Sequence, residues 1–203
     1  GNKLIGVTTY CNYPAETSKI QKVGDTLNPN IETIIALKPD VVFVSSDSQL
    51  ESFLSQLEKQ NISVFVTKSA NVEGIYQSLL QLGDVLGENE KAKILVESLK
   101  KRAADIEART ASAKDVKTFV QISKEPLFTI GKTSFITDLV GRAGGISVTE
   151  NVTEAYPKFS KETALALQPE AIILSESEDN REPNDVFKNS PAMKNGKVFK
   201  INA

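Results

Sequence analysis

The stretch IETIIALKPDVVFVS, residues 31–45, decides the fold because the chain contains it twice. At an offset of 130 positions (162 minus 32), residues 161–175 read KETALALQPEAIILS. Both copies carry a Glu-Thr pair, an Ala-Leu pair and a proline at the same places. The matching positions are Glu32 with Glu162, Thr33 with Thr163, Ala36 with Ala166, Leu37 with Leu167 and Pro39 with Pro169.

Each copy predicts a short helix that ends at a proline and leads into a buried strand. A capping residue, Asn30 or Ser160, stands before apolar residues at helical spacing. A β-branched or apolar run follows each proline. A chain with the same α/β unit in each half most simply forms two similar lobes, and two lobes form a cleft.

Length and composition are those of an ordinary globular protein. Of the 203 residues, 40% are apolar and 25% are charged, and the net charge of −2 argues against a nucleic-acid partner. No run approaches the roughly 18 apolar residues of a membrane span. No charged segment followed by an apolar core stands at the start, so we expect a signal sequence to be absent from this chain.

Missing residue types exclude several kinds of chemistry. The chain has no histidine, which removes Ser-His and Cys-His catalysis and the usual zinc sites. Its single cysteine, Cys11, excludes an internal disulfide and has no second soft metal ligand near it. Gly144-Gly145 marks a helix end, since no phosphate-binding pattern follows a strand. We expect no metal site, no catalytic residue and no cofactor of its own.

The first half of the chain predicts a parallel sheet with right-handed crossovers. We expect a buried strand at 3–8 and an irregular stretch at 19–29. The elements after the first repeat helix are a central strand at 41–46, a helix at 49–60 and a strand at 63–67.

Two helices come next. Asn71 caps a helix that runs to Leu86 and is ended by Gly87. A long, highly charged helix is expected from Glu88 to about Ser112. It is either a solvated surface helix or, because it lies midway between the repeat copies, a rigid strut between lobes.

The remaining elements complete a second lobe. Besides the second repeat, they are strands at 118–123, 127–131 and 197–202, a helix at 134–143 and a short helical run at 185–188. The predicted organisation is an N-terminal α/β lobe, 1–87, a connecting helix, 88–113, and a C-terminal α/β lobe, 114–203.

Three motifs together resemble a known family. They are GVTTYCNYP at 6–14, the repeated ET-x-x-AL-x-P unit, and GKTSFITDLVGRAGG at 131–145 followed by Tyr156-Pro157. They are similar to the substrate-binding proteins of ABC importers that carry cobalamin, haem and iron-siderophore complexes. The Tyr-Cys-Asn-Tyr-Pro loop and the later Tyr-Pro are most like the cobalamin-binding branch.

The resemblance implies an α/β fold with two Rossmann-like lobes, parallel sheets, one long joining helix and a ligand cleft between the lobes. Family members usually have a further strand and helix before Lys3 and a further helix after Ala203, which we expect this chain to lack. The loop after the missing strand normally helps to form the cleft.

The same resemblance assigns ligand-binding positions. It places three loop tyrosines, Tyr10, Tyr13 and Tyr156, at the mouth of the cleft, where they would stack on a flat macrocycle. It places Phe128 at the edge of the cleft. Thr26 and Asn28 stand where the family often has a bulkier contact residue. The alternative is structural, since each tyrosine ring can cover a loop–core junction and Phe128 can belong to the core.

Glu32 and Glu162 occupy the second position of the two equivalent helices. A favourable interaction with the helix dipole, worth about 0.3 to 1 kcal/mol, would suffice to explain each acid. The resemblance implies instead that one acid per lobe pairs with arginines on the two halves of a symmetric membrane permease. Identical placement in both lobes favours docking, although duplication of one unit also explains it.

The expected function is therefore that of an extracytoplasmic binding component, in the periplasm or on the outer face of the cytoplasmic membrane. It would trap a corrinoid such as cobalamin and deliver it to an ABC permease dimer. The four arginines, Arg102, Arg109, Arg142 and Arg181, lie outside the tyrosine loops, which favours a weakly charged ligand over an anionic siderophore or haem. An enzyme in which Glu32 and Glu162 act as an acid–base pair is the alternative of another class.

Overall fold

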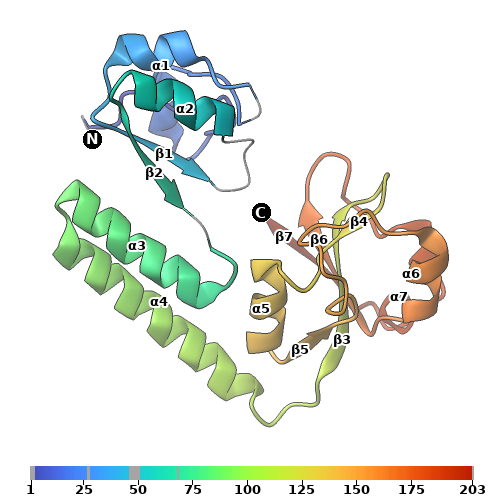
Figure 1. The fold of residues 1–203 in the computed structure, drawn as a ribbon. Coiled ribbons are helices and arrows are strands. Elements are labelled where there is room, and N and C mark those ends of the chain that lie inside the picture. Colours follow the sequence, from blue (N-terminus) through green and yellow to red (C-terminus); the bar gives the residue numbers. More distant parts are fainter. Residues whose placement is uncertain (1–2, 27, 46–50, 68, 203) are drawn as a thin grey trace. The chain divides into compact units, whose positions relative to one another are not determined.

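The computed structural model describes residues 3–26, 28–45, 51–67 and 69–202 (Figure 1). They form two compact units, Gly1–Lys68 and Ser69–Ala203, called here the first and second units. Each unit has its own sheet, so the fold is α/β with parallel pairing in both halves. The predicted fold class is confirmed.

The first unit is built on two parallel strands, β1 (Val41–Ser45) and β2 (Ser63–Thr67). Helices α1 (Ile31–Leu37) and α2 (Glu51–Lys59) supply Ile34, Phe53 and Leu57 to a small core against these strands. The strand expected at 41–46 and the helix expected at 49–60 are therefore present, although residues 46, 49 and 50 lie outside the described residues.

Two expectations for the first unit are wrong. Residues 3–8 do not form a buried strand, because only Val7 makes an isolated bridge, to Lys22, while Leu4 and Ile5 are 51% and 39% exposed. β1 is not a central strand among the described residues, because β2 is its one partner there. The stretch at 19–29 is irregular, as expected, apart from isolated bridges.

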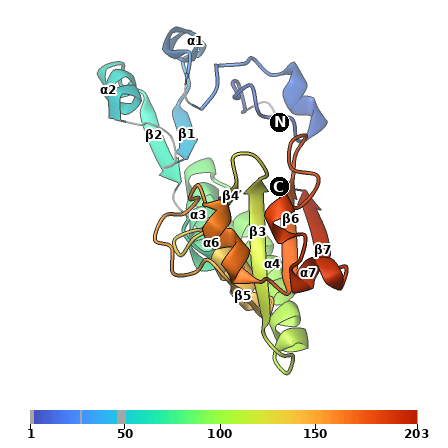
Figure 2. The ribbon, with the colours of Figure 1, turned by 90° about the vertical axis from the view of Figure 1, so that its right-hand side faces the viewer.

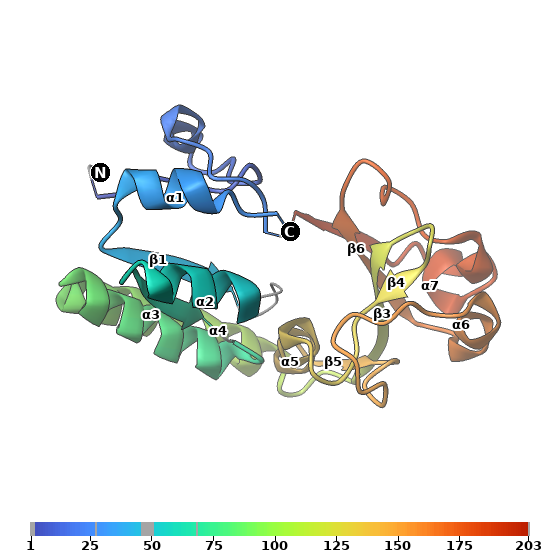
Figure 3. The ribbon, with the colours of Figure 1, turned by 45° about the horizontal axis from the view of Figure 1, so that its top comes forward.

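The second unit begins with an antiparallel helix pair, α3 (Val72–Leu86) and α4 (Asn89–Thr110), which lie side by side in Figures 1 and 3. The side chain of Asn71 accepts a hydrogen bond from the Gly74 amide at 2.8 Å, and Gly87 ends α3 in the left-handed conformation with φ 70°. Both ends of α3 match the prediction because both signals are local.

The second unit's sheet has the order β4-β3-β6-β7, and β5 also pairs with β3. β3 (Val116–Ser123) runs parallel to β5 (Gly145–Ser147) and β6 (Ala171–Glu176) and antiparallel to β4 (Phe128–Thr129). β7 (Val198–Asn202) lies parallel beside β6, as Figure 2 shows.

Helices cover both faces of this sheet (Figure 3). On one face, Val120 packs with Val140 of α5 (Phe135–Arg142). On the other face, Phe119 packs with Ala164 of α6 (Lys161–Leu167) and Ala192 of α7 (Pro191–Lys194). Two 3-10 helices, Ala15–Lys19 in the first unit and Asp185–Phe187 in the second, complete the described elements. Neighbouring residues of β3 thus serve opposite faces, as the strand period requires.

The repeat seen in the sequence is also a repeat in structure. The side chains of Asn30 and Ser160 accept hydrogen bonds from the amides of Thr33 and Thr163 at 2.9 and 3.1 Å. Both helices are seven residues long and end at a residue in the left-handed conformation, with φ 49° and 45°. One helix–proline–strand unit is therefore used once in each compact unit.

The compact units divide the chain before α3, whereas the sequence places the first lobe boundary at residue 87. Both helices of the pair belong to the second unit, where Val72 and Tyr76 of α3 pack with Val96 of α4. The role of α4 as a strut between lobes stays a prediction.

Candidate functional site

Tyr10 and Tyr13 lie on an exposed loop of the first unit, 68% and 87% exposed. The loop continues a segment that runs beside residues 21–24. The Val7 amide donates to the Gln21 carbonyl at 3.0 Å, and the Thr9 amide donates to the Gly24 carbonyl at 2.9 Å. The tyrosine rings are exposed while the loop's backbone is held in place.

A lysine that the sequence reasoning missed holds this loop. The Lys22 ammonium donates to the carbonyl oxygens of Cys11 at 3.0 Å and of Thr8 and Thr17 at 3.4 Å. Thr17, which is buried, adds hydroxyl hydrogen bonds to the carbonyls of Cys11 and Pro14. No sequence signal identifies Lys22, because its partners are backbone groups that any residue carries.

Thr26 and Asn28 stand on a turn beside the tyrosine loop, and both are exposed. The Asn28 amide donates to the Asp25 carboxylate at 2.6 Å, which closes the turn. Gly24 opens it with φ 91°, where a side chain would be strained and would meet the Asn28 carbonyl. Because Thr9 is hydrogen bonded to Gly24, the structure brings the four predicted ligand-binding residues of the first unit to adjacent segments.

Phe128 and Tyr156 lie on adjacent segments of the second unit. Residues 155–159 run antiparallel beside β4, since the Thr129 amide donates to the Pro157 carbonyl and the Gly131 amide to the Ala155 carbonyl. Phe128 lies opposite Lys158 in this pairing, two residues from Tyr156. Tyr156 is 42% exposed and Phe128 is half-buried. That these two residues share one site with the loop of the first unit stays a prediction.

Glu32 and Glu162 are both exposed, each at the second position of its helix. Neither carboxylate has an ion-pair partner among the described residues. The acids are available to a partner protein. Neither acid is enclosed as the acid–base pair of a closed active site would be.

A cluster of buried amides fills the region where β3 and β6 end, which is where open α/β sheets usually bind ligands. The Gln121 side chain donates to the side-chain oxygen of Asn180 at 2.6 Å, and the backbone amide of Asn184 donates to the side-chain oxygen of Gln121 at 2.7 Å. Asn180 also donates to the carbonyl of Ser175 at 2.8 Å. All three amide residues are buried, so this cluster fixes the loop after β6.

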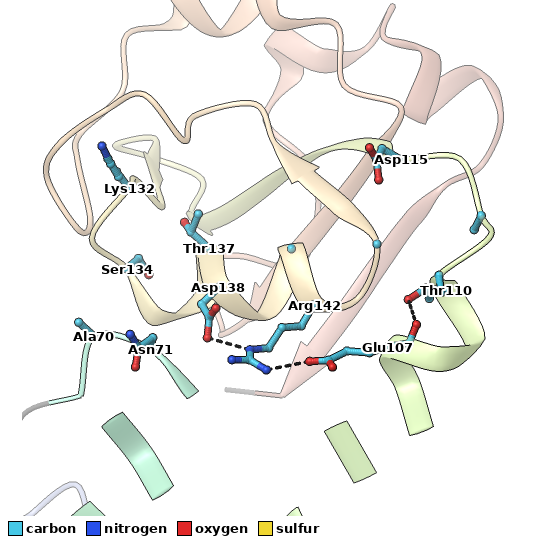
Figure 4. Close-up of a pocket in the computed structure, with 14 residues that line it drawn as sticks. Ala70, Asn71, Glu107, Thr110, Asp115, Lys132, Ser134, Thr137, Asp138 and Arg142 are labelled. Atoms are coloured by element: carbon cyan, nitrogen blue, oxygen red, sulfur yellow. Dashed lines mark hydrogen bonds and ion pairs between the residues drawn. The ribbon is translucent and has the colours of Figure 1, made fainter. Parts of the chain in front are cut away.

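A polar groove lies where α5 meets the ends of α3 and α4 in the second unit (Figure 4). Asp138 accepts from the Val72 amide at 2.8 Å and from Arg142 at 3.1 Å, and Arg142 also donates to Glu107 at 2.7 Å. The hydrogen bond to Glu107, and then that to Asp138, raise the pKa of Arg142. These charges satisfy one another, and no predicted ligand-binding residue lines the groove.

Among the residues that the structure describes, no group of three or more Cys, Asp or Glu side chains is arranged to hold a metal ion. Within the same residues, no helix is both long enough and apolar enough to cross a membrane.

The family model for periplasmic binding proteins matches residues 1–203, the whole chain. The chain belongs to this family. The sequence resemblance is thus confirmed, and the family is one of binding proteins.

Two curated relatives support this membership. An uncharacterized ABC transporter substrate-binding lipoprotein of Bacillus subtilis is 31% identical over 210 residues, which cover 99% of this chain and 66% of the relative. The vitamin B12-binding protein of Salmonella typhi is 33% identical over 171 residues, 84% of this chain and 64% of the relative. This periplasmic binding protein chain therefore spans just under two thirds of the length of these relatives.

Two solved structures share the fold. The periplasmic vitamin B12 binding protein of Vibrio cholerae matches with a TM-score of 0.84 at 22% identity, over 100% of this chain and 80% of that one. The periplasmic haem binding protein of the same organism matches with the same TM-score at 18% identity. That match covers 98% of this chain and 80% of the haem binding protein. One fold thus occurs in proteins named for two different ligands.

Proposed function

We propose that this chain is the ligand-binding part of an extracytoplasmic receptor for an ABC importer, and that its ligand is cobalamin or a related corrinoid. The observation that carries the proposal is the pair of highly exposed tyrosines, Tyr10 and Tyr13, on a backbone fixed by hydrogen bonds. Exposed aromatic rings on an ordered loop suit a flat, largely apolar ligand, because a ring is already placed for stacking before binding. The receptor performs no chemistry.

Two observations support a corrinoid over other ligands. The vitamin B12-binding relative is 33% identical to this chain. The two segments with the predicted aromatic contacts contain no arginine, the residue best suited to bind the carboxylates of haem or the anionic groups of a siderophore. Haem is the alternative ligand, because a haem-binding protein matches the fold with the same TM-score as a vitamin B12-binding protein.

Calorimetric titration with cyanocobalamin, haem and a ferric catecholate tests the ligand. We expect cyanocobalamin to bind and Tyr10→Ala to weaken this binding by about two- to tenfold, since one stacked ring is worth about 0.5 to 1.5 kcal/mol. Tyr10→Phe is the matched control, because it keeps the ring and should change the dissociation constant little. Binding of haem or the catecholate but not of cyanocobalamin would contradict the ligand assignment.

We also propose that Glu32 and Glu162 dock the receptor onto its permease. Each acid is exposed on one copy of the repeated helix, and neither has an ion-pair partner among the described residues. Charges at an interface rim act mainly on association and orientation, so their loss should leave the ligand site unaffected.

The Glu32→Ala/Glu162→Ala double variant should bind ligand with wild-type affinity and fail to stimulate the ATPase of the partner transporter. The control is Glu58→Ala/Glu150→Ala, which removes one exposed acid from each unit elsewhere and should keep the stimulation. If the first variant instead loses ligand affinity, the two acids belong to the ligand site, and docking by them is ruled out.

A further inference from the structure

We infer that Lys22 is the positioning residue of the ligand loop: its ammonium group organises the backbone that presents Tyr10 and Tyr13. This inference rests on the proposed function, because it gives Lys22 a role in ligand affinity. Lys22 itself lies on the neighbouring segment, outside the loop that carries the tyrosines.

The number of partners matches the number of donors. A lysine ammonium has three N–H donors, and Lys22 lies within 3.4 Å of three carbonyl oxygens, those of Thr8, Cys11 and Thr17. These carbonyls flank the two tyrosines on both sides along the chain. One cation therefore ties together the start, the middle and the end of the loop.

Side-chain burial does not explain the order of this loop. Tyr10 and Tyr13 are mostly exposed, and Thr17 is the buried residue of the short 3-10 helix that follows. The backbone hydrogen bond from the Cys11 amide to the Thr8 carbonyl closes one turn only. The contacts of Lys22 and of the Thr17 hydroxyl thus replace the apolar core that the loop lacks.

The ammonium also has no carboxylate partner among the described residues, and the protein groups that accept its hydrogen bonds there are the three carbonyl oxygens. Hydrogen bonds from a charged donor are stronger than those between neutral groups. Removing the donors should loosen the loop, and a loosened loop loses affinity because binding must then order it.

Three variants and two measurements test the inference. Lys22→Met keeps the length of the side chain and removes the donors, Lys22→Arg restores donors, and Lys19→Met makes the same charge change at an exposed lysine three residues away. The first measurement is the dissociation constant for cyanocobalamin. The second is the rate at which a thiol reagent modifies Cys11, the only cysteine, which lies inside the loop and contacts the Thr8 hydroxyl at 3.3 Å.

We expect Lys22→Met to weaken cyanocobalamin binding about tenfold and to speed Cys11 modification about tenfold. Lys19→Met should stay within about twofold of wild type in both measurements. Lys22→Arg should fall between wild type and Lys22→Met, because a planar guanidinium keeps the charge and donors but does not reproduce the ammonium's three directions of donation. The same variants are then made in a Tyr10→Ala/Tyr13→Ala background. If Lys22 acts through the two rings, Lys22→Met should cause no further loss of affinity there, since the effects of coupled residues do not add.

An unchanged Cys11 rate in Lys22→Met would overturn the inference, and so would an equal loss of affinity with and without the tyrosines. If the wild-type chain binds none of the three candidate ligands, the proposed function fails. The Cys11 rates then decide by themselves whether Lys22 orders the loop.

Discussion

At Gly131, just after β4, the backbone leaves no room for a side chain. A Cβ there would come closer than 3.0 Å to the carbonyl oxygens of Glu154 and Val152, which belong to the segment that runs beside β4. These are backbone atoms, which cannot move aside as a flexible side chain can. The glycine therefore permits the close pairing that places Tyr156 near Phe128.

We predict that Gly131→Ala lowers the free energy of unfolding by about 1 to 3 kcal/mol, the usual cost of overpacking. Gly141→Ala is the control, because the new methyl group meets no atom within 4 Å on helix α5. It should be neutral or stabilising by up to about 1 kcal/mol. Urea unfolding of both variants gives the comparison, and equal effects would show that the close approach is not the cause.

Glu170 should make the stability of the folded protein depend on pH. Its carboxylate accepts a hydrogen bond from the Lys117 amide at 3.0 Å, which is the main reason why its pKa lies below the ordinary value of 4.5. A lowered pKa in the folded state stabilises the protein above the unfolded-state pKa, and this contribution is lost as the pH falls through the folded-state pKa.

The stability difference between wild type and Glu170→Gln should therefore be complete above pH 4.5 and shrink as the pH falls below it. Urea unfolding at a series of pH values measures this difference. Glu162→Gln is the control, since that exposed acid makes no hydrogen bond among the described residues. A difference that does not vary with pH would show that the carboxylate charge plays no part.

The chemistry of single residues was predictable only where the residue type itself carries the signal. The aromatic loop stood out because tyrosine is rare in this chain. Lys22 did not stand out because its partners are backbone carbonyls. Gln121 did not stand out because its partners, the Asn180 side chain and the Asn184 backbone amide, lie about 60 positions away in the sequence. Contacts of that kind arise from tertiary packing and leave no local pattern.

Helices were predicted correctly where capping residues in the sequence set their ends. Strands were predicted wrongly where their formation depends on a paired neighbouring strand. The ends of α3 follow from Asn71 and Gly87, and both repeat helices follow from their caps and prolines. Residues 3–8 are apolar enough for a strand, but a strand also needs a paired neighbour, and only Val7 has a bridge. The short elements β5 and α7 were missed because three or four residues are too few to show a period.

The contact between helices α3 and α4 gives a prediction for a pair of positions. A Cβ on Gly83 would come closer than 3.0 Å to the Cβ of Ala92, since the two helices approach closely near the turn at Gly87. Gly83→Ala should therefore destabilise the protein by about 1 to 3 kcal/mol, despite the better helix propensity of alanine.

The second substitution Ala92→Gly should recover most of that loss, because it removes the methyl group that the new one meets. By itself, Ala92→Gly should cost about 1 kcal/mol from helix propensity. Urea unfolding of both single variants and the double variant measures the coupling. Additive effects would show that the helices can separate at this point without cost.

On the scale of the whole molecule, the repeat correctly predicted an α/β sheet in each half of the chain, while the lobe boundary at residue 87 stays a prediction. Sequence order places α3 with the strands before it, whereas packing places it with α4 and the sheet that follows. Polar contacts help to hold α3 and α4 against the rest of the second unit. Asp138 on α5 accepts from the first amide of α3, and Arg142 joins α5 to Glu107 on α4.

This polar chain predicts how the second unit opens. The Asp138 carboxylate accepts hydrogen bonds from the Val72 amide of α3 and from Arg142 within α5. Asp138→Ala removes both and leaves the Val72 amide without its acceptor, at a cost of about 1 to 3 kcal/mol, while the Arg142–Glu107 contact between α5 and α4 remains. Hydrogen exchange of the amides in α3 and α4 should become faster by roughly tenfold or more, while exchange in β3, whose neighbours are unchanged, should stay at the wild-type rate.

Glu90→Ala is the matched control, since Glu90 on α4 forms an exposed ion pair with Lys93 that is worth little. It should leave exchange in both regions unchanged. Equal acceleration in α3, α4 and β3 after Asp138→Ala would mean that the second unit opens only as a whole. Faster exchange confined to the helices would mean that the contacts of Asp138 and Arg142 hold the helix pair to the sheet. The pair could then open while the sheet stays folded.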